Sequence, residues 1–158
     1  MADDDSLFLA TDESVVQVGD WLAEVLRLEP IPEPSDIPDE VGLRGRAATI
    51  EDGWLGFLVH RNWHAESDPE PDEVQAIDPY SVQIDIWYSA KDEVVQQQEA
   101  RLVFDALVTA RPDIAMLLSH NLTILVAAHL PGAGTHYFDS KTTLDAPDQP
   151  HWQPWVCS

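Results

Sequence analysis

Hydrophobic and polar residues recur in two successive blocks along the chain. In the first block, a short apolar run at residues 6–10 predicts a strand, and Thr11 is the expected N-cap of the helix that follows. Apolar residues on one face of that helix recur at helical spacing: Val15, Val18, Leu22, Val25 and Leu26. The apolar segments 41–50 and 54–61, separated by the turn residues 51–53, predict a β-hairpin.

The second block repeats this order. Apolar and polar residues alternate over residues 81–88, which predicts a strand with one apolar face. A helix is expected from residue 91 to residue 110, because Pro112 stops it. Two further strands, at residues 114–119 and 122–129, complete the block.

Both blocks therefore read strand, helix, strand, strand, and the predicted fold class is α+β. Two βαββ-like halves, residues 1–64 and 81–130, are expected to join edge to edge in one mainly antiparallel sheet of about six strands. Two helices are expected to pack on one face of this sheet. Residues 65–80 form an acidic, proline-containing linker, and residues 131–158 predict an irregular C-terminal tail. At 158 residues, the chain has the size of a single domain.

The charge of the chain changes which partners are expected. Eight Lys and Arg residues against 29 Asp and Glu residues give a formal net charge of −21. Such a charge repels phosphate backbones and anionic lipids, so no nucleic-acid or membrane partner is expected, whereas a basic protein would be attracted. Acidity that serves solubility alone would give the same composition. Without a signal-peptide pattern at the N-terminus or an apolar run of membrane-spanning length, the predicted location is cytoplasmic.

Residue patterns that carry catalysis or bind a cofactor are not apparent. The segment 132–134 contains two glycines but lacks the helix pattern and the lysine of a phosphate site. His60 and His64 are four residues apart, yet this spacing straddles the end of a strand, so metal-ligand geometry is not expected. Cys157 is the single cysteine and excludes an internal disulfide. The chain is therefore predicted to be no enzyme and to hold no cofactor and no metal.

Residues predicted to bind a partner lie in two acidic loops and on outward strand positions. An exposed tryptophan beside arginine is typical of the centre of a protein interface. The predicted set is Asp36, Asp39, Glu40, Glu70, Asp72, Glu73, Arg44, Arg46, Asp85 and Trp87. In the alternative interpretation, Trp87 lies under the C-terminal tail, and Arg44 and Arg46 pair with neighbouring carboxylates.

The acidic loops at residues 29–40 and 66–78, on a small α+β scaffold, resemble immunity proteins of bacterial polymorphic toxin systems. That resemblance implies a cytoplasmic bacterial protein that binds a basic toxin domain and occludes its active site. The order of elements also resembles the saddle-like sheets of the TATA-binding-protein class. Only the architecture could carry over from that class, because the charge of −21 opposes DNA binding.

Two other functions remain open from the sequence. The first is a small-ligand-binding or regulatory module with a pocket between the sheet and the C-terminal tail. Its expected walls are Trp152, Trp155, His129 and Tyr137. The second is an enzyme that uses carboxylates together with His60 or His129.

Overall fold

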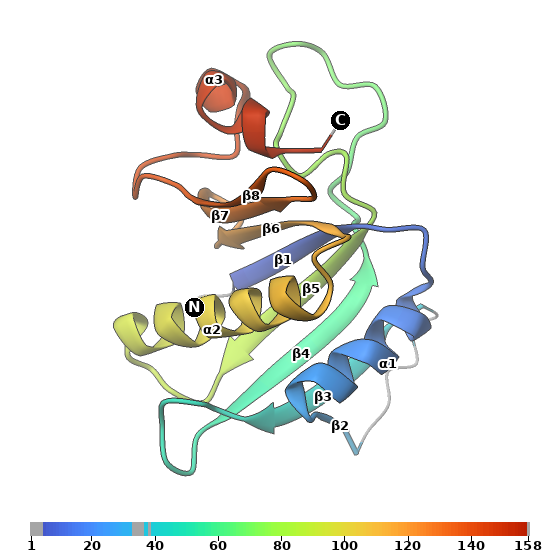
Figure 1. Ribbon diagram of the computed structural model, residues 1–158, viewed down its shortest axis with the longest axis vertical. Coiled ribbons are helices and arrows are strands. Elements are labelled where there is room, and N and C mark those ends of the chain that lie inside the picture. Colours follow the sequence, from blue (N-terminus) through green and yellow to red (C-terminus); the bar gives the residue numbers. More distant parts are fainter. Residues whose placement is uncertain (1–4, 33–36, 38, 158) are drawn as a thin grey trace.

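The protein is described by a computed structural model that covers residues 5–32, 37 and 39–157. Its centre is one eight-stranded antiparallel sheet with the strand order β2-β3-β4-β5-β1-β6-β7-β8 (Figure 1). The strands are β1 (Asp5–Ala10), β2 (Glu29–Pro30), β3 (Val41–Arg46), β4 (Trp54–Arg61), β5 (Val82–Tyr88), β6 (Ala115–His120), β7 (Ile124–Leu130) and β8 (Gly134–Tyr137). The helices are α1 (Val15–Leu26), α2 (Glu93–Ala110) and the short α3 (Gln149–Trp152), with 3₁₀ turns at Ala146–Asp148 and Gln153–Trp155.

The α+β class is confirmed, but the expected number of about six strands was wrong. The first extra strand, β2, lies in the segment predicted to be an acidic loop and pairs only two residues with β3. The second, β8, lies in the segment predicted to be an irregular tail. There the chain reverses through Gly132 and Gly134, both at positive φ, and pairs with β7. Both strands are too short to produce a periodic pattern in the sequence.

The two halves are interleaved rather than joined edge to edge. Strand β5 of the second half lies between β4 and β1, and β1 of the first half lies between β5 and β6. Each half therefore pairs its first strand with a strand of the other half: β5 with β4, and β1 with β6. Figure 1 shows the sheet strongly twisted, with β2 and β3 at one end and β8 at the other.

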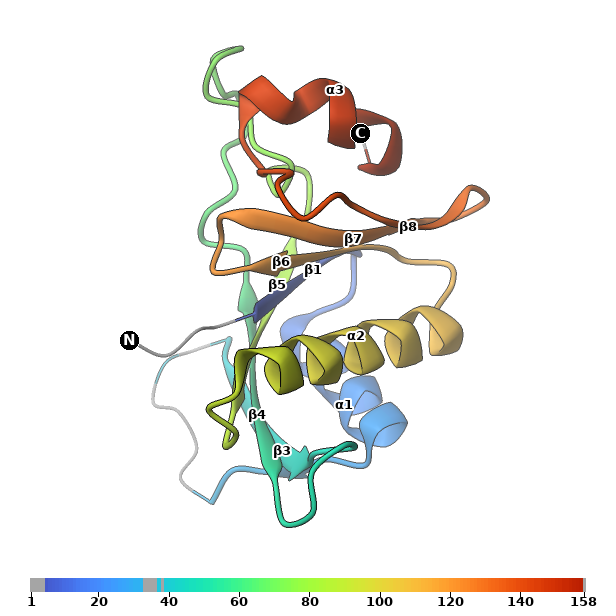
Figure 2. The same ribbon diagram turned by 90° about the vertical axis from the view of Figure 1, so that its left-hand side faces the viewer.

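Alternate residues of β1 contribute to two separate hydrophobic cores, because successive side chains of a strand point to opposite faces. Leu7 and Leu9 belong to the larger core, together with side chains from both α1 and α2. Phe8 belongs to the second core, which is closed by Tyr80 from the loop between β4 and β5 and by Trp152 from α3. Figure 2 shows α3 at the opposite end of the molecule from β3.

Helix α1 begins at a capping box one turn later than the sequence suggested. The Ser14 side chain accepts a hydrogen bond from the Gln17 backbone N–H at 3.1 Å, and the Gln17 side chain accepts one from the Ser14 backbone N–H at 2.8 Å. Thr11 is therefore not the N-cap; its hydroxyl accepts a bond from the backbone N–H of Glu13. Two reciprocal bonds satisfy more of the free N–H groups at the helix start than Thr11 alone could.

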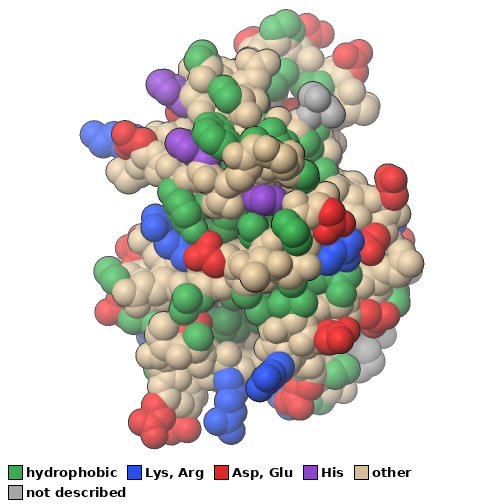
Figure 3. All heavy atoms as spheres, viewed as in Figure 1, with side chains coloured by type: hydrophobic (Ala, Val, Ile, Leu, Met, Phe, Trp, Pro, Cys, Tyr) green, Lys and Arg blue, Asp and Glu red, His purple; other side chains and the backbone are tan. Residues whose placement is uncertain are grey.

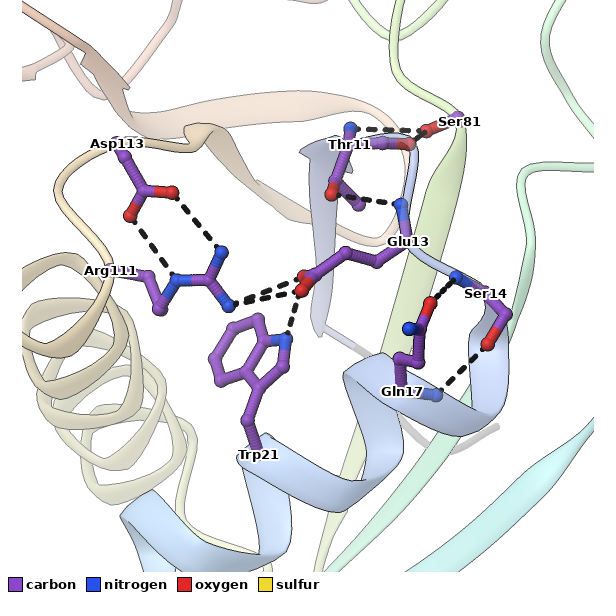
Figure 4. Close-up of polar contacts among 8 residues, drawn as sticks. All are labelled: Thr11, Glu13, Ser14, Gln17, Trp21, Ser81, Arg111 and Asp113. Carbon is purple, nitrogen blue, oxygen red and sulfur yellow. Dashed lines mark hydrogen bonds and ion pairs between the residues drawn. The ribbon is translucent and has the colours of Figure 1, made fainter.

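The start of α1 is tied to the end of α2 by an ion-pair cluster (Figure 4). Arg111, directly after α2, donates hydrogen bonds to Glu13 at 3.2 Å and to Asp113 at 3.1 Å. Its guanidinium also lies over the Trp21 ring, 5.2 Å from the centroid, and the Trp21 indole N–H donates to Glu13 at 3.0 Å. The packing of α1 against α2 is thus fixed by polar contacts at this end.

No helix in the described part of the chain has the length and apolarity needed to cross a bilayer.

Glu99 of α2 anchors the connection between β3 and β4. Its side chain is buried, and its two carboxylate oxygens accept bonds from the Ala48 backbone N–H at 3.0 Å, the Thr49 backbone N–H at 2.7 Å and the Thr49 hydroxyl at 2.6 Å. A buried carboxylate with several donors is stable only while those donors remain in place. The β3–β4 hairpin is therefore positioned by α2.

We expect Glu99→Gln to lower the free energy of unfolding by about 1–3 kcal/mol, because the amide group turns one acceptor into a donor facing backbone N–H groups. Urea unfolding followed by tryptophan fluorescence measures the change. Glu24→Gln, on the exposed side of α1, is the matched control and should leave stability unchanged. Equal stability of Glu99→Gln and the wild type would show that Glu99 does not anchor the hairpin.

Candidate functional site

A groove of about 920 Å³ lies over β2, β3, β4 and β5 and reaches the C-terminal end of α1. We call it the Arg–Trp groove. Its lining residues are Leu26, Arg27, Leu28, Glu29, Ile31, Arg44, Gly45, Arg46, Trp54, Gly56 and Trp87. Its volume lies within the range of protein clefts that bury a ligand or an anchoring side chain.

Antiparallel pairing places the central residues of the groove in one row. Arg44 of β3 is opposite Gly56 of β4, and Gly56 is opposite Trp87 of β5. Arg46 is likewise opposite Trp54. Because residues directly opposite one another point to the same face of a sheet, these side chains converge on one surface.

Gly56 forms the floor of the groove between the two tryptophans. A Cβ atom at this position would lie 3.1 Å from the Trp87 ring and 3.4 Å from the Trp54 ring. Both indoles therefore lie close to Gly56, and a side chain there would crowd the Trp87 ring. Trp54 is 47% exposed and Trp87 is half-buried, so both can lose further surface to a bound partner.

The groove has a local excess of positive charge on a strongly acidic protein. It contains three of the eight basic residues, Arg27, Arg44 and Arg46, and one carboxylate, Glu29. Arg44 pairs with Glu29 at 3.1 Å, but both side chains are largely exposed, so this ion pair contributes little to stability. Within the part of the chain that the structure describes, Arg27 and Arg46 form no ion pair.

Three of the residues predicted from the sequence meet in this groove: Arg44, Arg46 and Trp87. Sequence reasoning missed Arg27 and Trp54. Trp54 could have been found by counting along the predicted hairpin, since it is opposite Arg46. Arg27 follows the last turn of α1 at a positive φ of 56°, and no periodic pattern places it beside β3.

The remaining predicted residues lie elsewhere, so the ten do not form one surface. Asp39 is exposed and Glu40 half-buried just before β3, while Asp36 lies outside the described residues. Glu70, Asp72 and Glu73 are exposed in the loop at residues 62–81, at the opposite end of the molecule from β2 and β3 (Figure 1). Figure 3 shows Asp and Glu side chains at several separate places over the face seen in Figure 1.

Asp85, also predicted for the site, comes two residues before Trp87 on the same face of β5. Its side chain belongs to a polar network. Its carboxylate accepts hydrogen bonds from the Ser6 hydroxyl at 2.8 Å, the Gln83 amide at 2.8 Å and the His60 Nε2–H at 2.8 Å. The His60 Nδ1–H donates to the Arg61 carbonyl at 2.6 Å, and the ring stacks on Trp63 with 3.8 Å between centroids. Both ring nitrogens of His60 thus face acceptors, which only the protonated imidazolium can satisfy.

The electrostatics of this pair follow from its contacts. Burial opposes the charged form of His60, but the hydrogen bonds to Asp85 and to the Arg61 carbonyl outweigh it and raise the pKa of His60 above 6.5. Burial likewise opposes ionisation of Asp85, yet the bonds from His60, Ser6 and Gln83 hold its pKa below 3.8. Both shifts favour the charged form of the pair, in which every hydrogen bond of the network has a donor and an acceptor.

The four residues expected to wall a pocket between the sheet and the C-terminal tail do not converge. His129 is bonded to the Pro112 carbonyl at 2.9 Å and Trp152 is buried in the second core. Trp155 stacks on His136, whereas Tyr137 packs edge-on against Phe104 of α2. These side chains therefore serve different contacts.

A smaller hollow of about 300 Å³ lies between α2 and strands β1, β6 and β7. In its wall, the His120 Nδ1 is 2.7 Å from the buried carboxylate of Asp5, which also accepts a bond from the Tyr88 hydroxyl. Within the described residues, no cluster of three or more His, Cys, Asp or Glu residues could hold a metal ion.

Comparison with models of protein families, with curated protein sequences and with solved structures found no match.

His60 predicts a pH dependence of stability. A group whose pKa is raised on folding stabilises the fold fully below its unfolded pKa of 6.5, and this contribution is lost as pH rises through the folded-state pKa. The unfolding free energy of the wild type minus that of His60→Asn should therefore shrink as pH rises above 6.5. Urea unfolding over a pH series measures it, with exposed His64→Asn as the control. A difference that stays constant or grows with pH would contradict the charged His60–Asp85 pair.

Proposed function

We propose that the protein is a non-catalytic inhibitor that binds a protein partner through the Arg–Trp groove, in the manner of an immunity protein that occludes a toxin's active site. One observation carries this proposal: two partly exposed tryptophans and three arginines line a single concave surface. Trp and Arg are the residue types most enriched among those that dominate binding energy at protein interfaces.

The chemistry of these side chains supports a protein partner. An indole ring has few rotatable bonds, so it buries a large apolar area with little loss of conformational entropy. Each guanidinium offers several N–H donors in a fixed plane, which bind carboxylates and backbone carbonyls of a partner. Together they provide both desolvated contact and orientation.

The net charge of −21 supports a basic partner over a nucleic acid or a membrane surface. Exposed loop residues such as Glu70, Asp72 and Glu73 lie far from the groove and would act on association through the long-range field. The groove itself would supply the desolvated contact. A cytoplasmic location and a bacterial origin belong to the same proposal.

The proposal predicts that Arg46→Glu and Trp87→Ala release a partner that the wild type retains. Immobilised wild-type protein is incubated with lysate of the source organism at low salt, and retained proteins are identified by mass spectrometry. Arg61→Glu, an exposed change of equal charge outside the groove, is the control. We expect one basic protein to bind the wild type and Arg61→Glu at equimolar ratio, and both groove variants to bind it at least about tenfold more weakly.

The isolated partner must also lose its own activity when the wild-type protein is added. If the partner is retained equally by Arg46→Glu, Trp87→Ala and the wild type, the groove is not the binding surface. A partner that binds through the groove but keeps full activity would show a binding protein that is not an inhibitor.

A further inference from the structure

We infer that the groove takes an acidic anchor, an Asp or Glu side chain on a protein segment whose neighbouring residues are basic. This inference rests on the proposed function, because it specifies the chemistry of the partner segment. It follows from the local charge of the groove, from the charge of the whole chain and from the placement of the two indoles.

The local charge selects an anion. Arg27 and Arg46 have no ion pair among the described residues, and Arg44 shares one exposed carboxylate, Glu29. Three guanidiniums against one carboxylate leave a net positive charge in the groove. A carboxylate entering it can accept two parallel N–H bonds from one guanidinium, the geometry in which arginine binds carboxylates most strongly.

The charge of the whole chain indicates which kind of molecule can bring this carboxylate to the groove. In physiological salt, charges farther apart than a Debye length of about 8 Å are largely screened, so the arginines determine the potential inside the groove, whereas the surface around it carries the carboxylates that give the chain its charge of −21. A nucleic acid or a second copy of this acidic chain would bring many further negative charges against that acidic surface, which opposes its binding. A carboxylate on a basic protein segment suits both regions, because the carboxylate can bind the arginines while its basic neighbours face the acidic surface around the groove.

The two indoles favour particular residues on either side of the acidic anchor in the bound segment. Trp54 and Trp87 lean over Gly56, and both line the groove together with the three arginines. Lys and Arg side chains that flank the anchor can lay their aliphatic stems and cationic ends on these rings, a contact that aromatic faces favour. The expected motif is therefore an acidic residue with Lys or Arg on both sides.

Displayed random peptides test this motif directly. They are selected on immobilised wild-type protein in physiological salt, with Arg46→Glu as the counter-selection and Arg61→Glu as the control. We expect the enriched peptides to share an Asp or Glu flanked by Lys or Arg. A synthetic copy of such a peptide should bind at least about tenfold more weakly to Arg46→Glu and to Arg27→Glu. Replacing its acidic residue by the matching amide should have the same effect on the wild type.

The outcomes separate this inference from the proposed function. Enriched peptides that require Arg46 but carry no acidic residue would overturn the acidic anchor while leaving the groove as the protein-binding surface. No enrichment of groove-dependent peptides would overturn both. ATP and inorganic phosphate are titrated against wild-type tryptophan fluorescence as the competing probes. A saturable change that Arg46→Glu abolishes would show a small-anion site and would overturn the protein anchor.

Discussion

The pairing of β1 with both β5 and β6 holds the rest of the structure together. The first strand pairs with β5 over residues Asp5 to Leu9 and with β6 over residues Asp5 to Ala10. Because β5 belongs to the second half of the chain, this pairing interleaves the two halves. It also separates the hydrophobic residues into two cores, with Leu7 and Leu9 on one side and Phe8 on the other. Loss of β1 would open the centre of the sheet and divide both cores.

The same arrangement creates the Arg–Trp groove. With β5 in the centre of the sheet, its other side pairs with β4, and the register places Trp87, Gly56 and Arg44 in one row across three strands. The His60–Asp85 network occupies the adjoining rows of the same face and pairs its own charges internally. This network therefore takes up none of the groove's arginines, and among the described residues Arg27 and Arg46 form no ion pair.

Periodic patterns predicted those parts of the fold that depend on local sequence. Alternation over residues 81–88 predicted a strand where β5 (Val82–Tyr88) lies, and the turn residues 51–53 correctly indicated the β3–β4 hairpin. The interleaved strand order could not be predicted, since it depends on which distant strands pair and not on the pattern within any one of them. The strands β2 and β8 are set by short backbone pairings that leave no periodic signal.

The same difference, between local patterns and contacts of distant residues, explains which residues of the candidate site could be predicted. Alternation places Arg44, Arg46 and Trp87 on the outward face, which is why the sequence indicated them. Asp85 also points outward, but its carboxylate is occupied by His60, Ser6 and Gln83, and a sequence does not reveal such bonds. The acidic loops were predicted from composition alone, and composition does not show that the loop at residues 62–81 lies at the opposite end of the molecule from β2 and β3.

Amide hydrogen exchange on the complex with the captured partner tests the central claim most directly, because it maps the bound surface without substitutions. The Arg–Trp groove predicts slower exchange in peptide fragments that contain residues 26–31, 44–46 and 54–56. Protection confined to the loop at residues 62–81, with unchanged exchange across β3 and β4, would contradict the account and place the interface on the acidic loop.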